Sequence, residues 1–390
     1  MNRIVILAFC ILASGASVLS ASGQLPLDAD DLRKVTLLFD APASNSLNCA
    51  VNQWGPNLDF VFRFIAGYMV RCRLSQFEAK KTAVFVFLRV TPESKAPSLF
   101  GSSFRIPELP PEMQNSNSRN LRKAKNEIGM SGAFAMGTGR YSVELLVIDD
   151  QNRTYHNKWR VRVAPSRSER SLRFAVDPLT VEPVDRVNWR TLSPYRTDGI
   201  RVTLMLDAAP INPFQSRLHA WDRGFLLQCI YSLLEQTPHR SVHLVAFNLD
   251  QQREIFRSDQ FDKADFQELS RTLGGMETAS VSVEALKKRN SPEFLATLTN
   301  RELAADRSDA IIFLGPNARM DARMNAAALT EKTSTSPPLF YFEYFPWPGA
   351  DFPDAIQWLV KAADGATFKI HSPAQLDQAI QKMLHQLKQD

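Results

Sequence analysis

The C-terminal half of the chain alternates apolar, strand-like runs with helical runs, and this alternation constrains the fold more than any other feature of the sequence. The first run, residues 200–207, is apolar, has the length of a strand and ends on Asp207. The later strand-like runs are residues 241–248, 309–315, 339–345 and 366–371. Because strands that alternate with helices form a parallel sheet covered on both faces, we expect a doubly wound, Rossmann-like α/β domain at residues 199–390.

Helical patterns fill the segments between these runs. The expected helices are residues 217–235, 263–273, 292–305, 322–332, 354–363 and 373–388, with a short edge strand at 253–257. Ser291 is placed to cap the helix that starts at Pro292.

Residues 33–165 show a different pattern, in which short runs rich in Val, Phe and Leu are separated by turn residues. The expected strands are residues 35–39, 59–65, 68–74 and 83–91, with turns at 55–56, 66–67 and 78–81. The clearest signal is a hairpin, because residues 141–148 and 159–163 alternate apolar with polar side chains around a turn at 149–152. This pattern predicts an all-β, Ig-like sandwich over residues 33–165. The proline-rich segment 166–198 is expected to be a linker, with room for an edge strand at 171–176.

The first 23 residues have the pattern of a signal peptide. Arg3 precedes an apolar core at residues 4–12, and small residues follow at 13–23. We expect cleavage near residues 21–24 and a secreted or periplasmic location. No stretch approaches about 20 uninterrupted apolar residues, so no transmembrane segment is expected.

The charge of the chain gives little support for nucleic-acid binding. The formal net charge is +5, and the basic residues are scattered. The expected export argues further against a nucleic acid. The partner that we expect is therefore a protein or a surface polymer.

Three cysteines follow the signal segment: Cys49, Cys72 and Cys229. In an oxidising compartment Cys49 and Cys72 could form a disulfide between two strands. The alternative, three buried thiols, stays open. Cys229 lies in an apolar helical run and is expected to be a buried free thiol.

Residues 200–390 resemble a von Willebrand factor type A domain in the order of their elements and in three local features. Asp207 closes the first strand, residues 274–278 (Gly-Gly-Met-Glu-Thr) precede a helix, and residues 362–368 precede the last strand. The layout of a signal, a β-sandwich and this domain is similar to that of bacterial secreted proteins related to the family. The resemblance implies a ligand site at the carboxyl ends of the strands.

The resemblance also implies a site for a hard cation, but most of its ligands are replaced in this chain. The family places serines at the positions of Ala209 and Ile211, a threonine at Met276, and a second aspartate where this chain has residues 315–317. A hard cation needs about six oxygen ligands. We therefore expect a degenerate site, with no metal and no cofactor.

The expected binding residues lie at the strand ends: Asp207, Thr278, Asn317, Trp347 and Asp351. The run 339–347 is unusually aromatic, and aromatic residues are preferred anchors of protein interfaces. Trp347 either contacts a partner or packs under a helix. For Asp207 the favoured interpretation is structural, as a helix cap or an acceptor of loop N–H groups, and the alternative is a charged contact at the binding edge.

No catalytic motif is found, since the chain has neither a Gly-x-Ser-x-Gly elbow nor a His-Glu-x-x-His pair. The sequence therefore favours an exported, non-enzymatic binding or adhesion-type protein. Two alternatives remain: a hydrolase-type enzyme that uses Asp207 with an unrecognised histidine or serine, and a structural component of the cell envelope.

Overall fold

The computed structural model divides the chain into two compact units. The β unit comprises Met1–Asp59, Arg63–Arg167 and Arg173–Asp185, and the α/β unit comprises Phe60–Phe62, Ser168–Leu172 and Arg186–Asp390. The structure describes residues 18–19, 25–26, 29–40, 45–77, 82–106, 127–184, 195–212, 215, 217–276, 291–317, 328–344 and 354–388. Most of the predicted signal segment, the predicted turn at 78–81 and most of the segment 107–129 lie outside these residues. Among the described helices, none is long and apolar enough to span a membrane.

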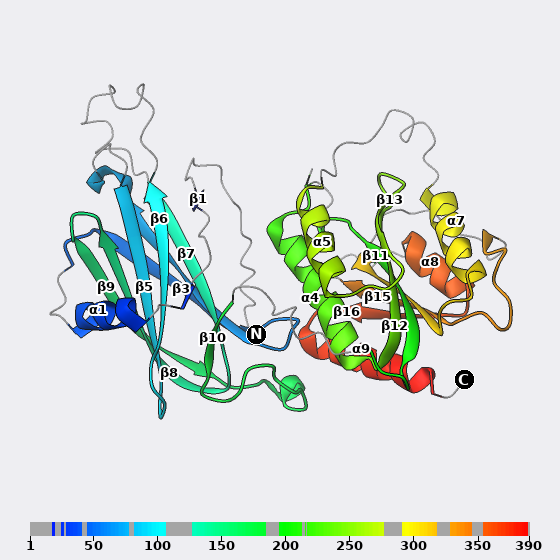
Figure 1. Ribbon diagram of the computed structural model, residues 1–390, viewed down its shortest axis with the longest axis horizontal. Helices are drawn as coiled ribbons and strands as arrows, with labels where there is room; N and C mark the ends of the chain where they lie inside the picture. Colours follow the sequence, from blue (N-terminus) through cyan, green and yellow to red (C-terminus); the bar gives the residue numbers. More distant parts are fainter. Residues whose placement is uncertain are drawn as a thin grey trace, which may run out of the picture. The chain divides into compact units, whose positions relative to one another are not determined.

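Two sheets form the β unit (Figure 1). The first sheet has the order β1-β7-β4-β3, with β10 paired to β7: β1 (Val18–Leu19), β7 (Glu127–Met136), β4 (Phe64–Arg73), β3 (Cys49–Leu58) and β10 (Val181–Pro183). The second sheet has the order β2-β6-β5-β8-β9: β2 (Leu25–Pro26), β6 (Ser98–Ile106), β5 (Thr82–Pro92), β8 (Gly139–Asp149) and β9 (Thr154–Val163). Apolar side chains from both sheets share one core. The unit is thus two β layers packed face to face.

The hairpin predicted from the alternating residues 141–163 is confirmed. β8 and β9 pair antiparallel, and Tyr141 and Val143 of β8 point into the core. In the first sheet Cys49 lies opposite Cys72, and the two are joined by a disulfide.

Several predictions for the N-terminal half are wrong in position. Residues 35–39 are not a strand but part of helix α1 (Ala29–Asp40). Residues 59–63 form the turn between β3 and β4, because the Asp59 carboxylate accepts hydrogen bonds from the backbone amide and the guanidinium of Arg63. The predicted turns at 55–56 and 66–67 lie inside β3 and β4, and the linker contributes β10 rather than a strand at 171–176.

The sheet of the α/β unit has the order β13-β12-β11-β14-β15-β16. Its strands are β11 (Ile200–Asp207), β12 (His239–Asn248), β13 (Arg253–Ser258), β14 (Ala310–Pro316), β15 (Leu339–Tyr344) and β16 (Ala366–Ile370). All pairs are parallel except that of β12 with the edge strand β13. Each strand predicted for this half is present, and chain order along the sheet reverses between β11 and β14.

Helices cover both faces of this sheet (Figure 1). One face packs against α4 (Ala220–Gln236), α5 (Lys263–Gly274) and α9 (Pro373–Gln386). The other packs against α7 (Ser291–Ala304) and α8 (Ala355–Ala362). Of the predicted helix 322–332, residues 322–327 lie outside the described part, and 328–332 form turns rather than an α-helix.

Candidate binding site at the strand ends

Asp207 lies where the order of the strands reverses. It is the last residue of β11, next to the end of β14. The two strands approach so closely that a Cβ built on Gly315 would lie 2.8 Å from the Cβ of Asp207, so that only glycine fits there. In doubly wound sheets, ligands bind outside the carboxyl ends of the strands at such a switch point.

The Asp207 carboxyl is fully buried, and within the described residues neither of its oxygens accepts a hydrogen bond of good geometry. Burial and the negative charges of Asp250 and Asp354 raise its pKa well above the usual value, and the nearby amide of Leu249 offsets this only in part. The interpretation of Asp207 as a helix cap or an acceptor of loop N–H bonds stays a prediction, with the amide of Leu249 as the nearby loop N–H group. A buried acid that lacks partners is costly, so it needs a reason to be there.

Polar groups from β14, β15 and α8 line the neighbouring strand ends. Asn317 Nδ2 donates to Glu343 Oε1 over 2.6 Å, and Gln357 donates to the other oxygen of Glu343. The hydroxyl of Tyr341 lies 3.0 Å from the carbonyl oxygen of Pro316 and 3.1 Å from Asp354 Oδ2. Burial, with Asp354 and Glu343 close by, raises the pKa of Tyr341 well above its usual value. These groups form a hydrogen-bonded polar layer at the edge that Asp207 shares.

A second carboxylate, Asp222, organises the loop after β11. Asp222 is buried in the first turn of α4 and accepts hydrogen bonds from the backbone amides of Ile211 and His219, each over 3.1 Å. The acidic side chain of Asp222 therefore holds two points of the loop, and the carbonyl oxygen of Ala208 accepts a further hydrogen bond from Asn248 Nδ2 over 2.8 Å. Trp221, beside Asp222, is 72% exposed, so that a large aromatic side chain stands free at the start of α4.

The cation site implied by the resemblance does not fit these residues. Ala209 and Ile211 carry no side-chain oxygen, and Met276 is a buried apolar residue packed in the core. The high pKa of Asp207 favours the neutral acid, which is a poor cation ligand.

Of the predicted binding residues, the structure brings Asp207 and Asn317 to the same edge. Thr278, Trp347 and Asp351 lie outside the described residues. Phe340 and Phe342 pack in the core, as their alternating positions in a covered strand indicate.

Three residues of this region were not predicted from the sequence: Glu343, Asp354 and Trp221. Glu343 interrupts an aromatic strand, Asp354 precedes a helix as a cap residue does, and Trp221 stands at the start of a helix. The sequence contains each of these local features. Only the fold shows that the three residues belong to elements that begin or end near the switch point.

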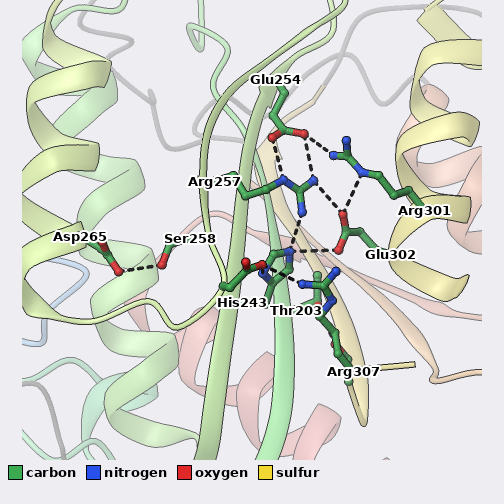
Figure 2. Close-up of polar contacts among 11 residues, drawn as sticks. Thr203, His243, Glu254, Arg257, Ser258, Asp265, Arg301, Glu302 and Arg307 are labelled. Atoms are coloured by element: carbon green, nitrogen blue, oxygen red, sulfur yellow. Dashed lines mark hydrogen bonds and ion pairs between the residues drawn. The ribbon is translucent and has the colours of Figure 1, made fainter. Parts of the chain in front are cut away.

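A separate charged cluster surrounds His243, which lies near the middle of β12 (Figure 2). His243 of β12 pairs in register with Thr203, four residues before Asp207 in β11. Its Nε2 lies 2.9 Å from Arg257 Nη1 and 3.0 Å from Glu302 Oε2, and its Nδ1 lies 3.2 Å from Asp259 Oδ1. His243 and Glu302 are both buried.

Arginines surround Glu302 in this cluster. Arg257 donates to Glu302 Oε1 over 2.8 Å, and Arg301 contacts both Glu302 and Glu254. Burial alone would raise the pKa of Glu302, but His243 and Arg257 outweigh it and hold that pKa below its usual value. Among the described residues, the buried pair of His243 and Glu302 is thus bordered by Arg257 and Arg301 and does not involve Asp207.

Comparisons with known proteins identify no family. No family model and no curated protein matches the chain. Among solved structures, the ArnB paralog VWA2 from Sulfolobus acidocaldarius is 13% identical and covers 62% of this chain and 50% of its own, with a TM-score of 0.26. The superoxide reductase (neelaredoxin) from Archaeoglobus fulgidus is 9% identical and covers 30% of this chain and 91% of its own, with a TM-score of 0.22. The putative ApaA protein from Bordetella pertussis is 9% identical and covers 32% of this chain and all of its own, with a TM-score of 0.20. Likenesses this weak carry no argument about function.

Proposed function

We propose that this chain is an exported, non-enzymatic binding protein that holds a protein or a surface polymer at the carboxyl ends of β11, β14 and β15. In this proposal the α/β unit is a von Willebrand A-like domain with a degenerate ion site, and the β unit is an Ig-like spacer or second module. The observation that supports it best is Asp207, a fully buried acid without a hydrogen-bond partner among the described residues, at the switch point of a doubly wound sheet.

A neutral, buried carboxylic acid can donate as well as accept a hydrogen bond. It therefore suits a polar partner group better than a metal ion. Exposed Trp221, at the start of the helix that follows the same loop, offers the kind of aromatic anchor that dominates many interfaces. The proposal assigns Trp221, Asn317 and Trp347 to recognition of the partner.

The enzymatic alternative needs a histidine or serine that can act with Asp207. Among the described residues no such group hydrogen-bonds to Asp207. The buried His243 lies elsewhere on the sheet, and its contacts are with Arg257, Asp259 and Glu302. The geometry therefore favours binding over catalysis at this site.

The test is a pull-down from the native envelope with the full mature chain, with and without chelator, followed by measurement of Kd for each captured partner. Trp221→Ala and Asn317→Ala should weaken binding about tenfold or more, since truncating an interface anchor costs at least about 1.4 kcal/mol. Trp54→Ala is the matched control, because Trp54 is a half-exposed tryptophan of the β unit. Chelator should have no effect. Equal affinities for all three variants, or binding abolished by chelator, would contradict the proposal.

Export is tested separately by sequencing the N-terminus of the protein recovered from its native cells. We expect the mature chain to begin just after residues 21–24. An N-terminus at Met1 in a cytosolic fraction would remove export from the proposal.

A further inference from the structure

The second sheet of the β unit has a strongly basic outer face, turned away from the core that it shares with the first sheet. Along β8, Arg140, Ser142 and Glu144 alternate with core residues such as Tyr141 and Val143. The partner strand β9 continues the pattern: Arg162 lies opposite Arg140, Arg160 opposite Ser142, and Lys158 opposite Glu144.

Helix α1 covers one part of this outer face. Val35 and Phe39 of α1 pack on Leu99, Leu146 and Ile148, which lie on the same outer face. The part that α1 leaves uncovered is the basic part.

An ion-pair network separates the two parts. Arg89 contacts Glu144 and also Asp40 of α1, and it lies over the ring of Phe39. Lys158 contacts the same Glu144. The charges along this boundary are thus neutralised within the protein.

Beyond the boundary lies a cavity of about 560 Å³. Side chains that line it include Thr91, Glu93, Arg140, Ser142, Arg160 and Arg162. The cavity is open to solvent, and its volume lies within the range of small-molecule sites.

The cavity has an excess of positive charge. Arg140 forms an ion pair with Glu93, in which Nη1 of Arg140 lies 3.6 Å from Oε1 of Glu93. Both side chains are more than 60% exposed. Arg160 and Arg162 form no ion pair within the part of the chain that the structure describes. Arg140 and Arg162 lie directly opposite each other on neighbouring strands, and like charges in that position are destabilising.

Ser142 supplies a polar group without a partner. Its hydroxyl oxygen is buried and has no hydrogen-bond partner among the described residues. A bound anion could accept a hydrogen bond from this hydroxyl and from the guanidinium groups around it.

We propose that this cavity binds a small ligand that carries an oxyanion, either a carboxylate or a sulfate or phosphate group. Arg160 and Arg162 bind the anion through charge-assisted hydrogen bonds, Ser142 donates a further hydrogen bond, and Arg140 adds positive charge beside Glu93. The bound anion lowers the repulsion between Arg140 and Arg162. This site is independent of the strand-end site of the α/β unit.

The test titrates the full chain by calorimetry at constant ionic strength with sodium sulfate, sodium phosphate, glucose 6-phosphate, galacturonate and neutral glucose. We expect saturable binding of at least one anion and none of glucose. The Arg160→Gln/Arg162→Gln variant should bind that anion about tenfold or more weakly, because it removes two positive charges and the charge-assisted hydrogen bonds that they donate. Arg105→Gln is the matched control, since Arg105 is an exposed arginine on β6 of the same sheet, outside the cavity.

The ligand series separates the two sources of the anion. Binding of phosphate and glucose 6-phosphate without galacturonate assigns a phosphate or sulfate ligand, and the reverse assigns a carboxylate. Ser142→Ala, which leaves the charge unchanged, should also weaken binding, and it replaces the double variant if that variant fails to fold. The proposal is overturned if no anion binds saturably, or if Arg105→Gln lowers the affinity as much as the double variant does.

Discussion

Asp207 combines a buried position with a carboxyl group that accepts no hydrogen bond of good geometry from a described residue, and this combination predicts an unusual dependence of stability on pH. Its pKa in the folded protein is raised by burial and by Asp250 and Asp354. The contribution of Asp207 to stability is therefore fully present below its pKa in the unfolded chain, about 3.9. This contribution is lost as the pH rises through its pKa in the folded protein. Between these two pKa values, each pH unit lowers the free energy of unfolding by up to about 1.4 kcal/mol.

Asp207→Asn should therefore raise the melting temperature, by an amount that grows from mildly acidic to neutral pH. The amide keeps the shape of the neutral acid and cannot ionise. Thermal melts of both proteins across this pH range measure the effect, and Asp364→Asn, at an exposed aspartate, is the control. A difference that stays constant with pH would mean that Asp207 is ionised in the folded protein.

Glu302 has the opposite pH behaviour. Burial alone would raise its pKa, but His243 and Arg257 lower it on balance. The stability that Glu302 contributes is therefore present above its unfolded pKa, about 4.3, and is lost as the pH falls through the folded value.

Glu302→Gln should destabilise the protein by up to about 3 kcal/mol at neutral pH, because it leaves the partly buried guanidinium of Arg257 without the carboxylate that it contacts. The loss should shrink in acid, where wild-type Glu302 is itself protonated. Denaturant unfolding at neutral and acidic pH measures both effects, with Glu331→Gln, an exposed position, as control. If the two variants are equally stable at neutral pH, the cluster in Figure 2 contributes no net stability.

At the scale of elements, α1 shows why a short apolar run is ambiguous. Residues 35–39 contain both β-branched and long apolar side chains, and five residues do not distinguish a strand from a helix. The spacing of four between Val35 and Phe39 places both on one face of a helix. That face is buried only because the second sheet presents Leu99, Leu146 and Ile148 to it, which no local pattern could show.

The packing of α1 on the second sheet predicts how stability depends on Phe39. Phe39→Ala should lower the free energy of unfolding of the β unit by about 3 kcal/mol, through lost burial and the empty space left behind. Leu38→Ala, on the same helix but 44% exposed, should change it little. Denaturant unfolding followed by a probe in the β unit measures both, and similar losses for the two variants would show that α1 does not pack as described.

The sequence predicted the α/β half far better than the β half, for physical reasons. Strands such as β11 and β14 are covered on both faces, so their apolar runs are continuous and have clear ends. By contrast β3 is mostly exposed and includes Asn52, Gly55 and Pro56, so no apolar pattern marks it. The turn at 59–63 was mistaken for a strand because its phenylalanines look like core residues in a short window.

The candidate site was predictable only in part. Asp207 followed from the order of the strands, because the last residue of the first strand lies at the edge where ligands bind. Its neighbours Glu343 and Asp354 lie far away in the sequence and come together only through the pairing of β14 with β15 and the placement of α8. The basic cavity needed the register of β8 and β9, which brings Arg140 opposite Arg162.

At the scale of the whole molecule, each unit has hydrophobic cores of its own, and the three cysteines divide between the units. The Cys49–Cys72 disulfide ties β3 to β4 in the β unit, whereas Cys229 is a buried free thiol of α4 in the α/β unit. A disulfide that closes a loop of this length stabilises by about 3 kcal/mol in the chain-entropy model. That stabilisation should be confined to the unit whose chain the disulfide constrains.

Hydrogen exchange measured by mass spectrometry tests whether the two units are stabilised separately, with one variant that alters each unit. Cys49→Ser/Cys72→Ser should lower the protection of amides in β3, β4 and β7 by up to about 3 kcal/mol and leave β11 and β14 unchanged. Cys229→Ser places a hydroxyl in an apolar core and should do the reverse. Equal losses in both units from either variant would show that the two unfold together, and the division into separately stabilised units would then be wrong. If the division holds, the oxyanion cavity and the strand-end site can each be altered without unfolding the unit that carries the other.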